Sequence, residues 1–189
     1  MNRKFRPFVS SATIVMGLCL LVVRPAWAQT EKATPPPARE LLTAALKTAQ
    51  AENKTVFVHF GASWCGWCKR LDKFLASPEV GKLMTDHYVL LNLTVQESPE
   101  KKALENPGAQ EVMTERGGEQ AGLPFYFFLN QDGKKLADSL VMPKGGNIGH
   151  PANAEEIKAF IGLLEKTAPR MTSEERLKIA EYLTKTLPK

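Results

Sequence analysis

The sequence predicts an α/β fold in which a central mixed sheet of about four strands is flanked by helices, with an extra helix at the C-terminus. Two observations carry this prediction. Residues 55–95 run in the order strand, helix, strand, which is the order of a βαβ unit with a parallel pair of strands. Residues 123–166 place two more strand-like runs around a tight turn and follow them with an amphipathic helix.

The composition is that of a globular domain. The 189 residues are 43% hydrophobic and 24% charged, which excludes a disordered or collagen-like chain. Three cysteines are too few for a mini-protein held together by disulfides. The formal net charge of +5 would favour a nucleic acid or an anionic membrane as partner, depending on where the charges lie.

The first 28 residues predict a secretory signal peptide. A basic start precedes an apolar run at residues 12–23, and Ala-Trp-Ala follows at residues 26–28 as a cleavage site. The run is shorter than the ~20 apolar residues of a membrane-spanning helix. Arg24 and Pro25 directly after it also disfavour a retained membrane anchor. We therefore expect cleavage after Ala28 and export to the periplasm or the medium.

Removal of residues 1–28 changes the charge and the cysteine count. This segment contains four basic residues and no acidic one, so the net charge falls from +5 to +1. A nucleic-acid partner then loses its support, and we expect none. Cys19 also leaves, so that Cys65 and Cys68 remain. In an oxidising compartment such a close pair is a redox device or a structural disulfide.

The mature chain begins with a proline-rich spacer at residues 29–39, followed by a domain at 40–189. Apolar residues at helical spacing predict a helix at 40–52. The nearly continuous apolar and β-branched run at 55–60 predicts a strand buried on both faces. A helix then opens at Cys65.

Serine followed by proline predicts a helix start at residue 77, and this short helix runs to residue 84. Alternating apolar residues predict a strand at 88–95. Residues 96–122 form a polar insert with a helix around 109–116. A second apolar run predicts a buried strand at 123–129.

Turn residues at 130–133 separate that strand from an antiparallel strand at 135–142. Asn153 and Glu156 have the spacing of a capping box, which predicts a helix ending near Lys166. The core of the domain therefore spans 55–166. A C-terminal helical extension follows at 172–187.

The chemistry of the chain centres on Cys65 and Cys68. Two intervening residues place both sulfurs on the first turn of a helix, close enough for a disulfide of normal geometry. The N–H groups and the positive end of the helix stabilise a thiolate at the first cysteine, lowering its pKa from ~8.5. We expect Cys65 to be the nucleophile and Cys68, one turn in, to be less exposed and to resolve a mixed disulfide.

The motif and its surroundings resemble the thioredoxin family. Residues 62–69, Ala-Ser-Trp-Cys-Gly-Trp-Cys-Lys, resemble the active-site loop, and residues 122–124, Gly-Leu-Pro, resemble the cis-proline element. The resemblance covers about 55–166. It implies a thioredoxin-like fold and a thiol:disulfide oxidoreductase whose redox-active disulfide is Cys65–Cys68, with no other cofactor.

The resemblance also implies how a substrate docks. Pro124 is expected to adopt the cis peptide and to lie against the disulfide, with the backbone of Leu123 binding the substrate chain. Trp64 and Trp67 flank the nucleophile and predict an apolar docking surface for an unfolded or loop substrate. The expected partners are protein thiols and disulfides and a redox partner protein, which for an exported reductase is in the membrane. We expect a monomer.

Two departures from the family pattern leave questions open. The family often has a carboxylate six residues before the first cysteine, where this chain has His59. With a reference pKa of ~6.5, His59 is either a proton shuttle or a core histidine. The middle dipeptide is Gly66-Trp67, without the proline of thioredoxins proper or the histidine of strong oxidants. The direction of electron flow is therefore left open.

Two other functions remain as alternatives. The chain could be a thioredoxin-fold binding module whose disulfide is idle. The two thiols could also handle a soft ion such as Cu(I) in the exported compartment. We predict no metal site, because the chain lacks a second C-x-x-C motif and its three histidines show no ligand spacing.

Overall fold

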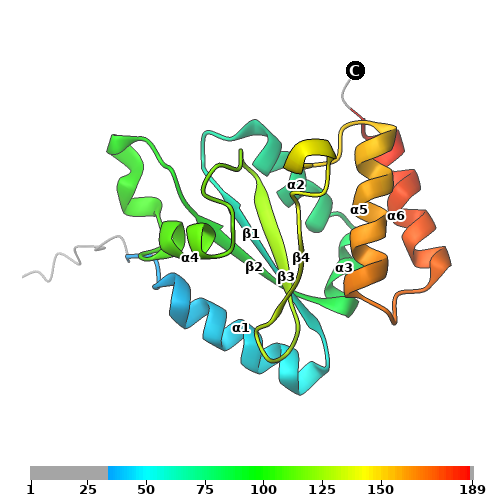
Figure 1. Cartoon of the computed structure of the whole chain (residues 1–189), viewed down its shortest axis with the longest axis horizontal. Coiled ribbons are helices and arrows are strands. Elements are labelled where there is room, and N and C mark those ends of the chain that lie inside the picture. The colour runs from blue at the N-terminus through cyan, green and yellow to red at the C-terminus, as the bar shows by residue number, and fades with distance from the viewer. Residues whose placement is uncertain (1–33, 188–189) are drawn as a thin grey trace, which may run out of the picture. The chain divides into compact units, whose positions relative to one another are not determined.

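The computed structural model describes residues 34–187 and is organised around a four-stranded mixed sheet (Figure 1). The sheet contains β1 (Thr55–Gly61), β2 (Tyr88–Thr94), β3 (Phe125–Leu129) and β4 (Lys135–Asp138) in the order β2–β1–β3–β4. β1 is parallel to β2 and antiparallel to β3, which is antiparallel to β4. The predicted signal peptide at 1–28 and the first part of the spacer lie outside the described residues.

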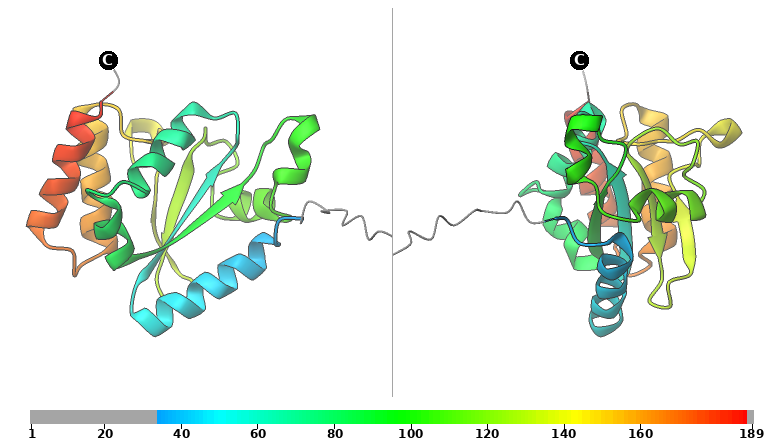
Figure 2. Two further views of the ribbon diagram at one scale, coloured as in Figure 1. Left: turned by 180° about the vertical axis from the view of Figure 1, so that it is seen from behind. Right: turned by 90° about the vertical axis from the view of Figure 1, so that its left-hand side faces the viewer.

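Helices cover both faces of the sheet. They are α1 (Ala38–Glu52), α2 (Gly66–Leu75), α3 (Gly81–His87), α4 (Ala109–Glu115), α5 (Ala154–Thr167) and α6 (Ser173–Lys185), with 3-10 turns η1 (Pro99–Leu104) and η2 (Pro143–Gly145). α1 and α4 pack on one face and α2, α3 and α5 on the other, while α6 lies against α5 (Figure 2). The predicted mixed α/β fold is confirmed. Within residues 34–187, no helix is long and apolar enough to span a membrane.

β1 is the central strand because its sequence is apolar on both faces. All seven of its residues are buried. Val56, Val58 and Phe60 point into the core beneath α1 and α4. Phe57 points to the opposite side and stacks on Phe128 of β3, with ring centroids 4.7 Å apart. The prediction of a strand buried on both faces is confirmed.

Side-chain caps begin the last two helices. Asn153 Oδ1 accepts a hydrogen bond from the backbone N–H of Glu156 at 2.9 Å at the start of α5. Thr172 and Glu175 form a reciprocal capping box at the start of α6. Each cap satisfies backbone N–H groups that have no partner within the helix.

The helix predicted at 40–52 begins two residues earlier than expected. α1 begins at Ala38, directly after Pro37. Ala38 is fully buried, and its N–H donates to the carbonyl of Pro107 at 2.8 Å. The end of the predicted spacer is therefore part of the packed domain, because a tertiary contact rather than a side-chain cap begins the helix.

Two other predicted boundaries are also wrong. Residues 77–80 form a turn, in which Ser77 Oγ accepts from the N–H of Val80 at 3.2 Å, and α3 begins only at Gly81. A side chain at Gly81 would collide with the carbonyl of Leu75, because the turn brings this residue against the end of α2. β4 ends at Asp138 rather than at residue 142. The side chain of Asp138 accepts a hydrogen bond from the backbone N–H of Leu140 at this end of the strand.

Candidate active site

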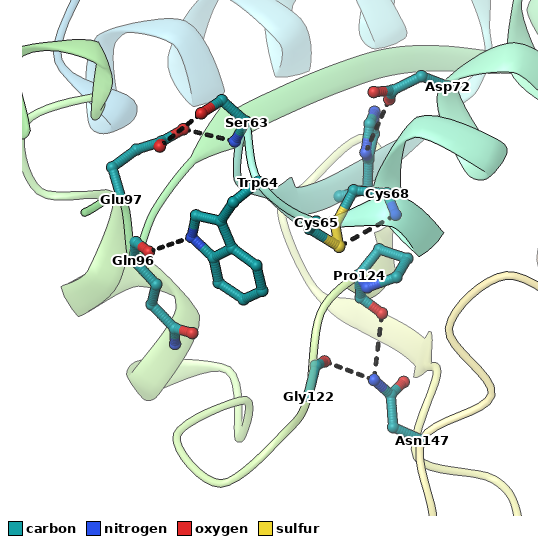
Figure 3. The surroundings of a disulfide bond; sticks show 11 residues. Ser63, Trp64, Cys65, Cys68, Asp72, Gln96, Glu97, Gly122, Pro124 and Asn147 are labelled. Atoms are coloured by element: carbon teal, nitrogen blue, oxygen red, sulfur yellow. Dashed lines mark hydrogen bonds and ion pairs between the residues drawn. A yellow bond between two sulfur atoms is a disulfide. The ribbon is translucent and has the colours of Figure 1, made fainter. Parts of the chain in front are cut away.

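The strand register brings the C-x-x-C segment and the Gly-Leu-Pro segment together. Phe60, near the end of β1, pairs with Phe125 at the start of β3. The residues after β1 therefore meet the residues before β3. Leu123 packs against the cluster formed by Ala62, Cys65 and Cys68, and the Leu123–Pro124 peptide bond is cis. Figure 3 shows Pro124 next to the disulfide, as this register requires.

Cys65 and Cys68 form a disulfide with an Sγ–Sγ distance of 2.10 Å and Cα atoms 5.3 Å apart. Cys65 is the N-cap residue of α2, and its Sγ accepts the backbone N–H of Cys68 at 3.1 Å. A thiolate formed on Cys65 would lie at the positive end of the helix, facing this N–H group. Such an environment lowers a thiol pKa and makes Cys65 the stronger candidate nucleophile.

The two cysteines are equally buried in the disulfide form, with 4% and 3% of their surfaces exposed. Cys68 is thus only slightly less exposed than Cys65 in this form, because the disulfide places both sulfurs in the same buried position. Trp64 and Trp67 beside them are 57% and 44% exposed. The guanidinium of Arg70 lies 5.4 Å from the ring centroid of Trp67. Both tryptophans thus present aromatic surface next to the disulfide.

The segment after β2 holds the residues before Cys65 in place. The carboxylate of the buried Glu97 accepts hydrogen bonds from the backbone N–H and the hydroxyl of Ser63, at 2.5 and 2.8 Å. The indole N–H of Trp64 donates to the carbonyl of Gln96 at 2.7 Å (Figure 3). These contacts hold the two residues before Cys65 against the segment that follows β2.

Sequence reasoning missed Gln96 and Glu97. A signal was present, because parallel strands end at the same edge of a sheet and functional groups gather beyond their carboxyl ends. β1 leads into the motif, and the parallel β2 leads into Glu97. An acidic residue just beyond the second strand of the βαβ unit therefore points to the active-site edge.

His59 lies in the middle of β1, beneath α2, and is almost fully buried. Its Nδ1 is 3.8 Å from Oδ1 of Asp72, and this Nδ1 has no hydrogen-bond partner among the described residues. Burial lowers the pKa of His59 to about 4, so the imidazole is neutral at pH 7. Partial burial raises the pKa of Asp72 above its ordinary value.

Asp72 is a third residue that sequence reasoning missed. It follows Cys68 by four positions on α2, a spacing that places two side chains on the same face of a helix. Both residues line a groove of about 370 Å³, together with Glu97 and Lys69. The second cysteine and two carboxyl groups thus line one groove.

A second groove lies on the other side of the disulfide. It has a volume of about 340 Å³ and is lined in part by Trp67, Leu123, Pro124, Asn147 and His150. The sequence-predicted docking residues therefore gather around this groove, except Trp64, which contacts the segment after β2. Among residues 34–187, no group of three or more histidine, cysteine or acidic side chains is placed to hold a metal ion.

The fold and the disulfide at a helix N-terminus define a thioredoxin-fold protein with a C-x-x-C centre. The chain belongs to the thioredoxin-like family, whose model matches residues 38–131. This match runs from the first residue of α1 through the C-x-x-C motif to the turn after β3.

The individual proteins that resemble this chain share only a third or less of the aligned residues with it. The chain is 33% identical over 93 residues to the thiol:disulfide interchange protein DsbD of Photorhabdus laumondii, covering 49% of this chain but only 14% of that protein. A disulphide isomerase from Xylella fastidiosa is 22% identical over 78% of this chain and 89% of its own, with a TM-score of 0.47. The oxidised C-terminal domain of DsbD from Neisseria meningitidis is 22% identical over 71% of this chain and 99% of its own, with a TM-score of 0.44.

The buried neutral His59 predicts a pH-dependent stability. Its pKa is lower in the folded state, about 4, than the ~6.5 of an unfolded chain, so protonation favours unfolding. This stabilisation is complete above about pH 6.5 and is lost as the pH falls towards 4, by roughly 3 kcal/mol. Denaturant titrations at pH 7 and pH 4 measure it. The variant His59→Gln should lose about 3 kcal/mol less over this range than the unmodified protein does. The loss that remains includes that of His150, whose pKa is also lowered to about 4 by burial and by Arg70. An equal loss in both proteins would contradict the assignment.

Proposed function

We propose that this chain is an exported thiol:disulfide oxidoreductase that acts on proteins through a mixed disulfide on Cys65. The observation that carries the proposal is the placement of Cys65 Sγ at the N-cap of α2, where it accepts the N–H of Cys68. Membership of the thioredoxin-like family and the similarity to part of a thiol:disulfide interchange protein support it. The Cys65–Cys68 disulfide itself is the redox centre, and no other cofactor takes part.

The reaction begins with the reduced pair. The Cys65 thiolate attacks a sulfur of the substrate disulfide, which forms a Cys65–substrate bond and releases the other substrate sulfur as a thiolate. The Cys68 thiolate then attacks Cys65 Sγ. This step forms the Cys65–Cys68 disulfide, releases the second substrate thiolate and leaves the substrate reduced by two electrons. The same steps in reverse oxidise a substrate dithiol.

The docking surface lies around the disulfide. The exposed rings of Trp64 and Trp67 offer apolar area for an unfolded or loop segment. Leu123, which packs against the cluster that contains the cysteines, offers its backbone to the substrate chain. The partners are protein thiols and disulfides, together with a redox partner protein that restores the pair, located in the membrane if the chain is a reductase. The protein acts as a monomer and binds no nucleic acid.

Cys68 must lose its proton before it can resolve the mixed disulfide. We propose that His59 shuttles this proton together with Asp72. The carboxylate of Asp72 lines the same groove as Cys68. Burial raises the pKa of Asp72, which makes its carboxylate a better proton acceptor. The neutral His59 can accept a proton on one ring nitrogen while releasing one from the other. Its Nδ1 lies 3.8 Å from Asp72 Oδ1.

Single cysteine variants test the function. Cys65→Ser should abolish the reduction of insulin disulfides, because the nucleophile is gone. Cys68→Ser should retain attack but accumulate mixed disulfides between Cys65 and its substrates, detectable on non-reducing gels. If the unmodified protein reduces insulin no faster than Cys65→Ser does, the chain is a binding module or a Cu(I)-handling protein instead. The in vivo redox state of the pair and its reduction potential then decide the direction of electron flow.

A histidine variant tests the proton route. His59→Ala should shift the pH dependence of the resolving step, followed as decay of the mixed disulfide in a stopped-flow experiment. The matched control is His87→Ala, which removes a histidine at the far end of α3. An identical pH profile in all three proteins would leave His59 with only a core role.

Export predicts a defined N-terminus. Expressed in full length in a Gram-negative host and recovered from the periplasm, the mature chain should begin with Gln29, as read by N-terminal sequencing. An intact mass that includes residues 1–28 would show a retained segment instead.

A further inference from the structure

The loop between β4 and α5 has no part in the proposed chemistry, yet its Asn147 contacts the cis-proline segment. Asn147 Nδ2 donates hydrogen bonds to the carbonyls of Gly122, at 2.6 Å, and Pro124, at 3.1 Å (Figure 3). These two carbonyls flank Leu123. One side-chain amide thus bridges the residues on either side of the position that the proposed function assigns to substrate docking.

The bridge is anchored in the core of the domain. Asn147 Oδ1 accepts the N–H of Gly149 at 3.2 Å, which fixes the orientation of the amide. The next residue, Ile148, is buried, and its N–H donates to the carbonyl of Ser139 at 2.9 Å. The donor therefore comes from a rigid part of the loop, and both N–H groups of the amide as well as its oxygen are used.

The loop also packs directly on the proline. Gly149 has a φ of +57°, a conformation that favours glycine, and a side chain there would lie 3.4 Å from Pro124 Cδ. His150 follows and packs near Trp67, with ring centroids 6.5 Å apart. Residues 147–150 thus form one wall of the groove beside the disulfide.

The contacts leave the backbone of Leu123 open. The carbonyls on either side of it are occupied by Asn147, whereas the N–H and the carbonyl of Leu123 have no hydrogen-bond partner among the described residues. Leu123 is only half-buried. An extended chain lying in the groove could therefore pair with both of these groups, as one strand pairs with another.

We propose that Asn147 is a positioning residue for protein substrates, which holds residues 122–124 in the form that pairs with an extended substrate segment. This inference rests on the proposed function, because it assumes that Leu123 docks the substrate chain. The contribution of Asn147 therefore applies to substrates that have an extended backbone next to the reacting cysteine. Small thiols, which have no such backbone, should react without help from Asn147.

The variant Asn147→Asp tests this role. Aspartate has the same shape and can still accept from Gly149, but it cannot donate to the two carbonyls and places a negative charge beside them. We expect the KM for a disulfide-bonded peptide to rise about tenfold, with kcat unchanged, since backbone pairing at Leu123 is weakened. Reduction of the Cys65–Cys68 disulfide by dithiothreitol should change by less than about twofold.

The matched control is Asn153→Asp, which makes the same change six residues along the chain. Aspartate caps a helix as well as asparagine does, so this variant adds the charge without removing a needed donor. It should react with the peptide as the unmodified protein does. If both variants raise KM equally, charge rather than the bridge is responsible, and the proposal is wrong.

A neutral variant separates positioning from misfolding and from failure of the proposed function. Asn147→Ala should raise KM for the peptide as Asn147→Asp does, with far-UV circular dichroism unchanged. A peptide KM unchanged in both variants, or a dithiothreitol reaction slowed as much as the peptide reaction, would overturn the role of Asn147. If the unmodified protein does not reduce the peptide at all, the proposed function fails instead, and that outcome is seen before any variant is compared.

Discussion

The pairing of β1 with both of its neighbours is the constraint on which the rest of the structure depends. Its parallel pairing with β2 brings Gln96 and Glu97 to the edge where the C-x-x-C motif begins. Its antiparallel pairing with β3 brings Leu123 and Pro124 to the same edge from the other side. This pairing requires that β1 be apolar on both faces, since helices cover the sheet on both sides. The active site is therefore a consequence of how the central strand is buried.

Burial also decides the electrostatics of this edge. His59 is neutral because the core of the sheet does not solvate an imidazolium. Glu97 is buried as well, but its carboxylate is held by two hydrogen bonds from Ser63. At the cysteines, the stabilising groups are instead the N–H of Cys68 and the end of α2. Burial near the disulfide is therefore compensated differently at each group: His59 stays neutral, Glu97 accepts hydrogen bonds, and Cys65 faces the N-terminus of α2.

Much of the fold could be predicted from local signals. The strand at Thr55–Gly61 follows from its apolar run, and α5 and α6 begin at capping residues that the sequence shows directly. The predictions failed where a distant contact sets a boundary. Ala38 begins α1 because its N–H reaches Pro107, and Gly81 begins α3 because it packs against the end of α2. Neither contact leaves a periodic pattern in the sequence.

The sequence by itself determined the cysteine pair, because two cysteines three positions apart at a helix start are neighbours whatever the rest of the chain does. It also indicated the Gly-Leu-Pro segment through its resemblance to the thioredoxin family. Only the tertiary structure decided what supports these residues. Glu97 is 34 positions from Ser63, and Asn147 is 25 positions from Gly122, so their hydrogen bonds exist only after the strands have paired. The spacing of residues along the chain determines short-range geometry. Long-range hydrogen bonds depend on the strand register, because only the paired sheet brings their donors and acceptors together.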